Sequence, residues 1–457
     1  MNRSRFLVAS SSAAALAACS SSGGVLTPPS LQARSSSGTR LSTSTFTRLE
    51  IAEFSKQHKL VASLRKGIKA LRAITDPRNT GSYTYWHYSH WMPSGKPPED
   101  MKAVWDQCRH KQSYFEPWHR GFLYYFEQAL RAASGDPDFA LPYWDYYKNP
   151  NLPEIFANPM LGNGEANPLY WADRQRNIVE GLIFKAFQDD ITVFPWGPGE
   201  TYEDLVERNP HGRVHSQIGG SMGRVPTAPA DPIFFLHHCN IDRLWSAWVA
   251  AGGKRSMPPR DSRWWDETFA YNLDRSWSVS VEQMEDTQNL GYMYNDLSLP
   301  APPRGASLPL RPPVIATGAA NAAGPIALDS NSITVEIPLD SRVAAARFID
   351  VVLDGVTLSE LGERGGYSYN VYANLPATRT PISQESSFEI GELGSFELSM
   401  PRMNGMAMLP GGARTLRFAA VGPGSSLLLS FVAYASPAGV SRGAELVRIG
   451  RISVVPR

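Results

Sequence analysis

Apolar residues recur at helical spacing through much of the first half of the chain. The run from Phe46 to Ile74 has this spacing, and Asp76 followed by Pro77 ends it. Pro117 suits the first turn of another helix, whose apolar face continues to Gly135. Both segments predict amphipathic helices that bury one face.

Two further helices are expected downstream. Asn209 and Pro210 form a typical helix start, and Gly219 with Gly220 ends that segment. A fourth helix is expected to begin near His237. Together these segments predict a helical bundle, a framework that often holds metal ligands on facing helices.

The pattern changes after residue 300. Residues 301–325 are rich in Pro, Ala and Gly and carry few charges, which predicts a linker. Residues 326–457 contain short β-rich runs separated by turn residues, at a spacing typical of a β-sandwich. We therefore expect a mainly α domain over residues 46–300, followed by a C-terminal β-sandwich domain.

The composition agrees with two globular domains and argues against one class of partner. The chain has 457 residues, of which 42% are hydrophobic, and a formal net charge of +1. Nucleic-acid binding depends on a marked excess of positive charge. We therefore expect no nucleic-acid partner.

The N-terminus has the features of an export signal. Met1 to Arg5 is positively charged, and the apolar run from Phe6 to Ala18 is too short to span a bilayer. Because Leu16 to Cys19 resembles the lipobox of bacterial lipoproteins, residues 1–19 are interpreted as a lipoprotein-type signal peptide that leaves Cys19 lipidated. Residues 20–45 then form a flexible tether. The alternative is an ordinary cleaved signal with an incidental cysteine. Either interpretation predicts export, to the periplasm or the cell surface, with membrane contact only through the lipid.

Histidines gather in two clusters that predict a metal site. The first contains His87, His90, His110 and His119, and the second contains His211, His215, His237 and His238. His211 and His215 are four positions apart, which places both rings on one face of a helix. A site of imidazoles alone favours copper or zinc. The zinc-protease motif is disfavoured, because Gly212 follows His211 where that motif needs a glutamate.

Two segments resemble the copper motifs of a known family. Asp231 to Trp245 is similar to the second copper motif of the type-3 copper polyphenol oxidases, which comprise tyrosinases and catechol oxidases. Phe115 to Arg120, together with Glu127, is similar to the first. The likeness is strong from about residue 75 to residue 300. It is weaker in the β domain, which resembles that of the plant enzymes.

The resemblance implies a fold and an activity. It predicts a helical catalytic domain that holds a dicopper centre and uses dioxygen to oxidise o-diphenols, or catechols, to o-quinones. Small phenols and dioxygen are then the partners. The resemblance also implies that the C-terminal β domain caps the active site and keeps the enzyme latent.

The family motifs assign three imidazoles to each copper ion. Carried over by position, the ligands are His90, His110 and His119 for one ion, and His211, His215 and His238 for the other. His87 is the alternative to His90, which is favoured because Met92 and Pro93 follow it as in the family. His237 is interpreted as a packed or supporting histidine.

Two residues are expected to support the ligands. In the family pattern Asp242 and main-chain carbonyls receive ring N–H bonds from the ligands and fix their orientation. Cys108 stands two positions before His110, as in relatives with a thioether between this cysteine and a copper ligand. A buried free thiol is the other interpretation of Cys108. Cys239 is expected in the core.

Three further residues are expected to tune the reaction. Glu207 matches an acidic residue that holds a water near the second copper ion and could take a phenol's proton. Gly212 stands where efficient monophenol hydroxylases often present Asn, which favours oxidation of o-diphenols over hydroxylation of monophenols. Val225 matches a small gate residue over the copper ion.

Several alternatives stay open at this point. The enzyme could be a tyrosinase with monophenolase activity or an o-aminophenol oxidase. A haemocyanin-like dioxygen carrier would use the same ligands but block substrate access, and a structural zinc bundle is a third class. The methionines between Met400 and Met408 could bind Cu(I) or fill apolar gaps.

Overall fold

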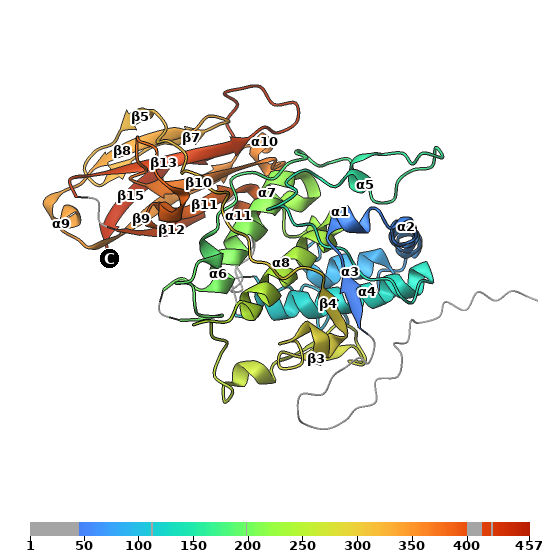
Figure 1. Ribbon diagram of the computed structural model, residues 1–457. Coiled ribbons are helices and arrows are strands. Elements are labelled where there is room, and N and C mark those ends of the chain that lie inside the picture. The colour runs from blue at the N-terminus through green and yellow to red at the C-terminus, as the bar shows by residue number, and fades with distance from the viewer. Residues whose placement is uncertain (1–44, 111–112, 198, 400–413, 422–423) are drawn as a thin grey trace, which may run out of the picture.

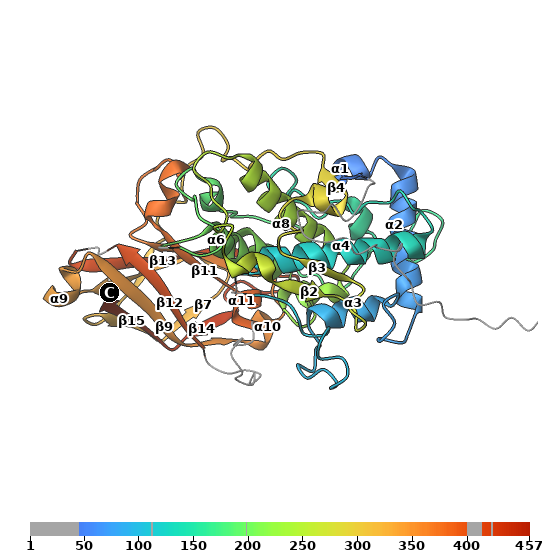
Figure 2. The same ribbon diagram turned by 90° about the horizontal axis from the view of Figure 1, so that it is seen from below.

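The computed structural model describes residues 45–110, 113–197, 199–399, 414–421 and 424–457. A helical domain and a β domain lie side by side, as Figures 1 and 2 both show. The expected signal peptide, nearly all of the expected tether and the Met400 to Met408 run lie outside the described residues. Within the described ranges, no helix has the length and apolar character needed to cross a bilayer.

The first domain consists of helices packed around one core. The α-helices are α1 (Ile51–Phe54), α2 (His58–Ala73), α3 (Tyr83–His90), α4 (Phe115–Ser134), α5 (Glu154–Ala157), α6 (Tyr202–Val206), α7 (Arg213–Ile218) and α8 (Ile233–Ala250). Shorter turns are η1 (Lys185–Phe187), the π-helical turn η2 (Glu207–Gly212), η3 (Gly220–Gly223), η4 (Ala228–Ala230), η5 (Arg263–Asp266) and η6 (Thr287–Leu290). The prediction of a mainly α first domain is confirmed.

The central helix α4 follows the sequence signals closely. Pro117 lies in its first turn, and Gly135 ends it in the left-handed conformation at φ 69°. Nearly every residue of α4 is buried, including His119, because other elements cover it on all sides. α4 packs against α2 and α8. The region from Phe46 to Ile74 contains a short strand and two helices, α1 and α2, in place of one continuous helix.

Short strands close the helical domain. The strand β1 (Phe46–Arg48) pairs in parallel with β4 (Tyr292–Tyr294), which joins the domain's beginning to its end. A second small pair is formed by β2 (Thr268–Ala270) and β3 (Ser278–Ser280).

The C-terminal domain is a sandwich of two sheets, as predicted. The five-stranded sheet has the order β11 (Glu389–Gly394), β10 (Tyr367–Ala373), β13 (Ser426–Ala435), β8 (Ile333–Pro338) and β5 (Val314–Thr317). The other has the order β6 (Ala322–Ala323), β15 (Arg451–Pro456), β9 (Phe348–Leu358), β14 (Val447–Ile449) and β7 (Ile326–Leu328), with β12 (Arg414–Val421) paired to β9. The connections include α9 (Ser341–Ala344), α10 (Glu360–Glu363), η7 (Ile382–Ser387) and α11 (Ser395–Ser399). Alternate apolar side chains of both sheets fill the space between them.

The expected linker over residues 301–325 needs a correction. Its C-terminal part contains β5 and β6, and β5 pairs in parallel with β8. The β domain therefore begins before residue 326. A strand this short, with Pro on its N-terminal side and exposed apolar residues, gives little periodic signal in the sequence.

The β domain packs directly on the helix α7. Arg213 of α7 donates to Ser368 Oγ at 2.6 Å and lies 3.4 Å from Glu392 Oε2, both in the β domain. Asn209 Nδ2 also donates to Glu392 Oε2, at 3.0 Å. Burial raises the pKa of Glu392 to about 7, while Arg213 acts in the opposite direction. This interface places one end of the β domain over the second histidine cluster.

Candidate metal centre

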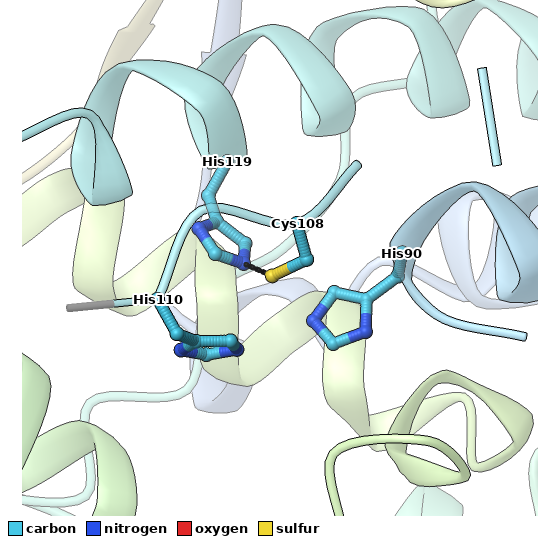
Figure 3. A group of neighbouring side chains, drawn as sticks. All are labelled: His90, Cys108, His110 and His119. Atoms are coloured by element: carbon cyan, nitrogen blue, oxygen red, sulfur yellow. Dashed lines mark hydrogen bonds between the residues drawn. The ribbon is translucent and has the colours of Figure 1, made fainter. Parts of the chain in front are cut away.

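Three elements bring the first group of histidines together. His90 is the last residue of α3, His110 lies on the connection before α4, and His119 lies in the first turns of α4. Figure 3 shows the three rings converging with the Cys108 side chain among them. One donor atom from each of these four residues lies within 4.8 Å of the others. His90 thus joins the group, whereas His87 Nε2 contacts the Pro226 carbonyl at 2.8 Å.

The second group faces the first. His211 in η2, His215 in α7, and His237 and His238 in α8 each offer an atom within 4.8 Å of the others. The Nε2 atoms of His215 and His238 lie 3.4 Å apart. Across the two groups, the rings of His119 and His238 stack with their centroids 4.4 Å apart. The seven imidazoles of the two groups therefore lie around one shared space.

Main-chain carbonyls orient the rings. The Nδ1 atoms of His119, His211 and His215 contact the carbonyls of Phe115, Glu207 and Met222 at 2.7, 3.0 and 2.9 Å. Nδ1–H donation to a carbonyl fixes the tautomer in which Nε2 carries a lone pair. The expectation that main-chain carbonyls orient the ligands is confirmed for these three rings.

The donor set fits metal ions. Both ring nitrogens of His90 and Nε2 of His211 are buried without a hydrogen-bond partner among the described residues. Burial, together with the neighbouring imidazoles, lowers the pKa of His90, His211 and His238, so these rings are neutral. A neutral imidazole with a free nitrogen is the form that binds copper. The two groups can therefore hold two ions.

His237 is the histidine that the motif comparison left outside the ligand set. Its ring stacks on that of His211, with centroids 5.4 Å apart and an interplanar angle of 18°. Burial lowers the pKa of His237 to about 3. His237 and His238 are adjacent in the sequence, so only one of them is expected to be a ligand. The spacing to Asp242 selects His238 and leaves His237 as the packed ring.

The expectation that Asp242 receives N–H bonds from the ligand rings is wrong. Its carboxylate accepts hydrogen bonds from Arg48, Arg120, Tyr292 and Tyr294. Burial opposes ionisation of Asp242, but Arg120 and Arg48 lower its pKa, so that it is charged. On α8 the Asp242 side chain points toward β1 and β4 because two buried guanidinium groups need an anion there.

Replacing Asp242 by leucine is expected to lower the free energy of unfolding by about 3–5 kcal/mol, because two buried guanidinium groups lose their counter-ion. Chemical denaturation followed by fluorescence measures this loss. Asp138→Leu, at an exposed position after α4, is the matched control. Equal stability of the two variants would show that the buried ion pairs contribute nothing.

Three other residues from the sequence prediction lie around the histidines. Cys108 is a buried free cysteine, and its Sγ lies 3.4 Å from His119 Nε2, the contact drawn in Figure 3. Glu207 Oε1 lies 3.1 Å from His110 Nδ1, so the carboxylate contacts one ring of the first group directly. Val225 is fully buried between η3 and η4.

Gly212 lies in η2 beside His211. A Cβ atom placed on Gly212 would stand 3.5 Å from the Glu207 carbonyl and 3.9 Å from Glu397 Oε2, which are ordinary contacts. A side chain at position 212 would therefore start next to Glu207 without a clash. Asn209 does not cap the following helix; its backbone is extended and its side chain binds Glu392 across the domain interface.

Phe396 of the β domain covers the centre, and no sequence signal indicated it. Its ring stacks on His215, with centroids 4.0 Å apart and an interplanar angle of 9°. It also lies 5.3 Å from the His211 ring and 5.8 Å from the His110 ring. The Phe396 amide donates to Ser216 Oγ at 3.1 Å, which anchors α11 to α7. Phe396 is fully buried, so it occupies the space above the histidines.

Comparisons with known proteins agree with this geometry. Residues 78–173 and 172–251 match the family model described as the common central domain of tyrosinase. Over these residues the chain resembles the tyrosinase family. The two histidine groups fit the two copper sites of that family's centre.

Proteins similar to this chain occur in bacteria and plants. The chain is 33% identical to the tyrosinase HcTyr1 of Hahella sp. (strain CCB-MM4), over 50% of this chain and 55% of the relative. It is 31% identical to a chloroplastic polyphenol oxidase of Malus domestica, over 42% of this chain and 39% of the relative. The chain thus spans about half, or less, of the length of these curated relatives.

A solved structure shares the two-domain fold. The latent apple tyrosinase matches with a TM-score of 0.53 at 21% identity, over 90% of this chain and 97% of that chain. At this identity the match supports the fold, namely a helical domain followed by a β domain.

Proposed function

We propose that this protein oxidises o-diphenols to o-quinones with dioxygen at a pair of copper ions. The observation that carries the proposal is the pair of facing imidazole groups, with buried ring nitrogens aimed at one shared space. His90, His110 and His119 would hold one ion, and His211, His215 and His238 the other. Copper held in these sites would supply the exchange of electrons between the o-diphenol and dioxygen.

The chain's own residues position the phenol and its proton. The Phe396 ring lies parallel to His215, and we propose that a substrate ring takes that place when Phe396 leaves. Glu207 would hold a water near the second copper ion and accept the phenolic proton on a carboxylate oxygen. Val225 would act as a small gate. A thioether between Cys108 and a ligand ring stays a prediction, as do export and lipid attachment at Cys19.

The β domain is proposed to keep the enzyme latent. Phe396 fills the space where substrate would bind, and hydrogen bonds and ion pairs along α7 hold the β domain there. Two of the proteins that share the fold carry the word latent in their names, an apple tyrosinase and an aurone synthase. In a dioxygen carrier the β domain would cover the histidines permanently. In an enzyme the β domain has to move away before a phenol can enter.

Gly212 favours o-diphenols over monophenols. Replacing Gly212 by asparagine is expected to raise the ratio of monophenolase to diphenolase activity several-fold, because the new amide can orient a water held by Glu207. The ratio of tyrosine hydroxylation to catechol oxidation is measured on the same sample. Covering of the site by the β domain lowers both rates and therefore does not change the ratio. Gly212→Ala adds a Cβ without an amide and serves as the control. An unchanged ratio in Gly212→Asn would show that Gly212 does not set the preference for o-diphenols.

A substrate panel tests the proposed function. The copper-loaded full chain is given catechol, tyrosine or o-aminophenol in air, and product formation is followed by absorbance. We expect o-quinone from catechol and little product from tyrosine. Dominant hydroxylation of tyrosine would identify a monophenolase, and preference for o-aminophenol would identify an aminophenol oxidase. Either result would contradict the proposed specificity.

A further inference from the structure

A buried carboxyl group without a partner lies beside the metal centre. Glu116 is the second residue of α4, and its side chain is almost fully buried. Neither carboxyl oxygen has a hydrogen-bond partner among the described residues. Native proteins rarely leave such a group unsatisfied, because a buried polar atom without a partner is costly. Glu116 therefore needs a partner that is not a side chain of the described structure.

Three other elements place buried polar atoms near Glu116. The Tyr202 hydroxyl is buried without a hydrogen-bond partner in the described ranges, and the Tyr146 hydroxyl and the Nδ2 atom of Asn240 are buried with only each other within reach. Both tyrosines interact electrostatically with Glu116, and Asn240 lies beside Tyr146. Arg243 Nε donates to Asn240 Oδ1 at 2.8 Å, which fixes the amide so that its N–H group is the free one. The four side chains thus offer polar atoms to one buried region.

The types of polar atom indicate the ligand. Burial raises the pKa of Glu116 well above its usual range, so its carboxyl can donate as well as accept a hydrogen bond. The amide N–H group donates, and a tyrosine hydroxyl does both. A cation is disfavoured because the Asn240 amide presents its N–H group. An anion is disfavoured because Glu116 and Glu203 are adjacent; the Glu116 amide donates to Glu203 Oε1 at 3.2 Å. Water, which donates and accepts two hydrogen bonds, matches all four side chains.

We propose that Glu116, Tyr146, Tyr202 and Asn240 form a buried site for ordered water molecules, and that Glu116 is a positioning residue for the metal centre. The role at the centre rests on the proposed function, whereas the water site does not. Two chains of contacts connect this site to the histidines. One passes through Tyr146 and the other through α6.

Both chains of contacts end at groups that touch the ligands. The Tyr146 ring lies 5.7 Å from that of His237, which stacks on His211. On the other side, Glu203 lies one helical turn before Glu207, and Glu207 contacts His110. Water molecules held by Glu116 would keep Tyr146 and α6 in place. They would thereby limit the movement of the His211 and His110 rings.

A crystal structure of the copper-loaded full chain tests the water site. We expect ordered water within hydrogen-bond distance of a Glu116 oxygen and of the Tyr202 or Tyr146 hydroxyl, and its loss in Glu116→Leu. Tyr202→Phe removes only the hydroxyl and should lose one of these waters. This variant keeps the test valid if Glu116→Leu fails to fold. A dry site, with Glu116 bonded directly to a tyrosine or to Asn240, would overturn the proposal.

Kinetics tests the positioning role. Glu116→Leu is expected to lower kcat for catechol roughly tenfold with little change in KM, whereas Glu116→Gln, which still binds water, stays within about twofold of the parent. The absorption spectrum of the oxygenated copper centre should shift in the leucine variant and not in the glutamine variant. Equal effects of the two replacements would overturn the positioning role. Lack of catechol oxidation even in the Phe396→Ala protein would instead refute the proposed function and leave the crystallographic result standing.

Discussion

Replacing His119 by alanine is expected to reduce o-quinone formation from catechol by on the order of a thousandfold or more, to the uncatalysed background. His119 offers a donor atom to the first group and stacks on His238 of the second, so its loss disturbs both groups. Oxygen uptake and quinone absorbance measure the effect on copper-loaded protein.

His58→Ala is the matched control for this prediction. His58 is an exposed histidine at the start of α2, and it lies outside both groups. The control should retain the parent activity and copper content. If His119→Ala oxidised catechol at a rate comparable with His58→Ala, the assignment of His119 as a ligand would fail.

Replacing Phe396 by alanine is expected to raise catechol oxidation by the full chain about tenfold or more without any other activation. The phenyl ring is fully buried against His215, and its removal opens the space that a substrate ring needs. The rate rises because the variant has an accessible site where the parent has a blocked one. The contacts of α7 with Ser368 and Glu392 do not involve Phe396, so the β domain stays docked. Initial rates at several catechol concentrations measure it.

Phe348→Ala controls for loss of a phenylalanine from the same domain. Phe348 lies on β9 and is 46% exposed, away from the α11 contact with α7. Its replacement should leave the activity of the full chain unchanged. Cutting the chain between the domains, at residues 301–325, should activate the enzyme in the same direction as Phe396→Ala. Equal activity of the parent, Phe396→Ala and the cut protein would show that the β domain is no cap.

The helical framework and the pairing of His211 with His215 follow from local signals in the sequence. Pro117 and Gly135 mark α4, and the spacing of His211 and His215 places both rings on one face. These signals depend on residues within one or two turns of each other, which is the range over which helix geometry dictates side-chain direction.

Contacts between distant segments could not be predicted in the same way. Asp242 binds Arg48, from the first strand of the domain, in place of a ligand ring. Phe396 reaches His215 from the short helix α11 of the other domain. Neither contact leaves a periodic pattern or a motif, since each depends on how two separately folded segments pack.

The early start of the β domain has a related cause. β5 belongs to the sheet only through its pairing with β8, and its own residues are mostly exposed. Composition alone therefore indicated a linker. The π-helical turn η2 was also unforeseen, because Asn209 is directed to Glu392 across the domain interface and does not cap a helix.

Oxygen uptake during catechol oxidation by the fully copper-loaded chain distinguishes a dicopper oxidase from a dioxygen carrier. We expect two coppers per chain and one dioxygen consumed for every two o-quinones formed, with water as the reduced product. Reversible binding of dioxygen without any quinone, in protein whose Phe396 has been replaced by alanine, would contradict this expectation and identify a carrier.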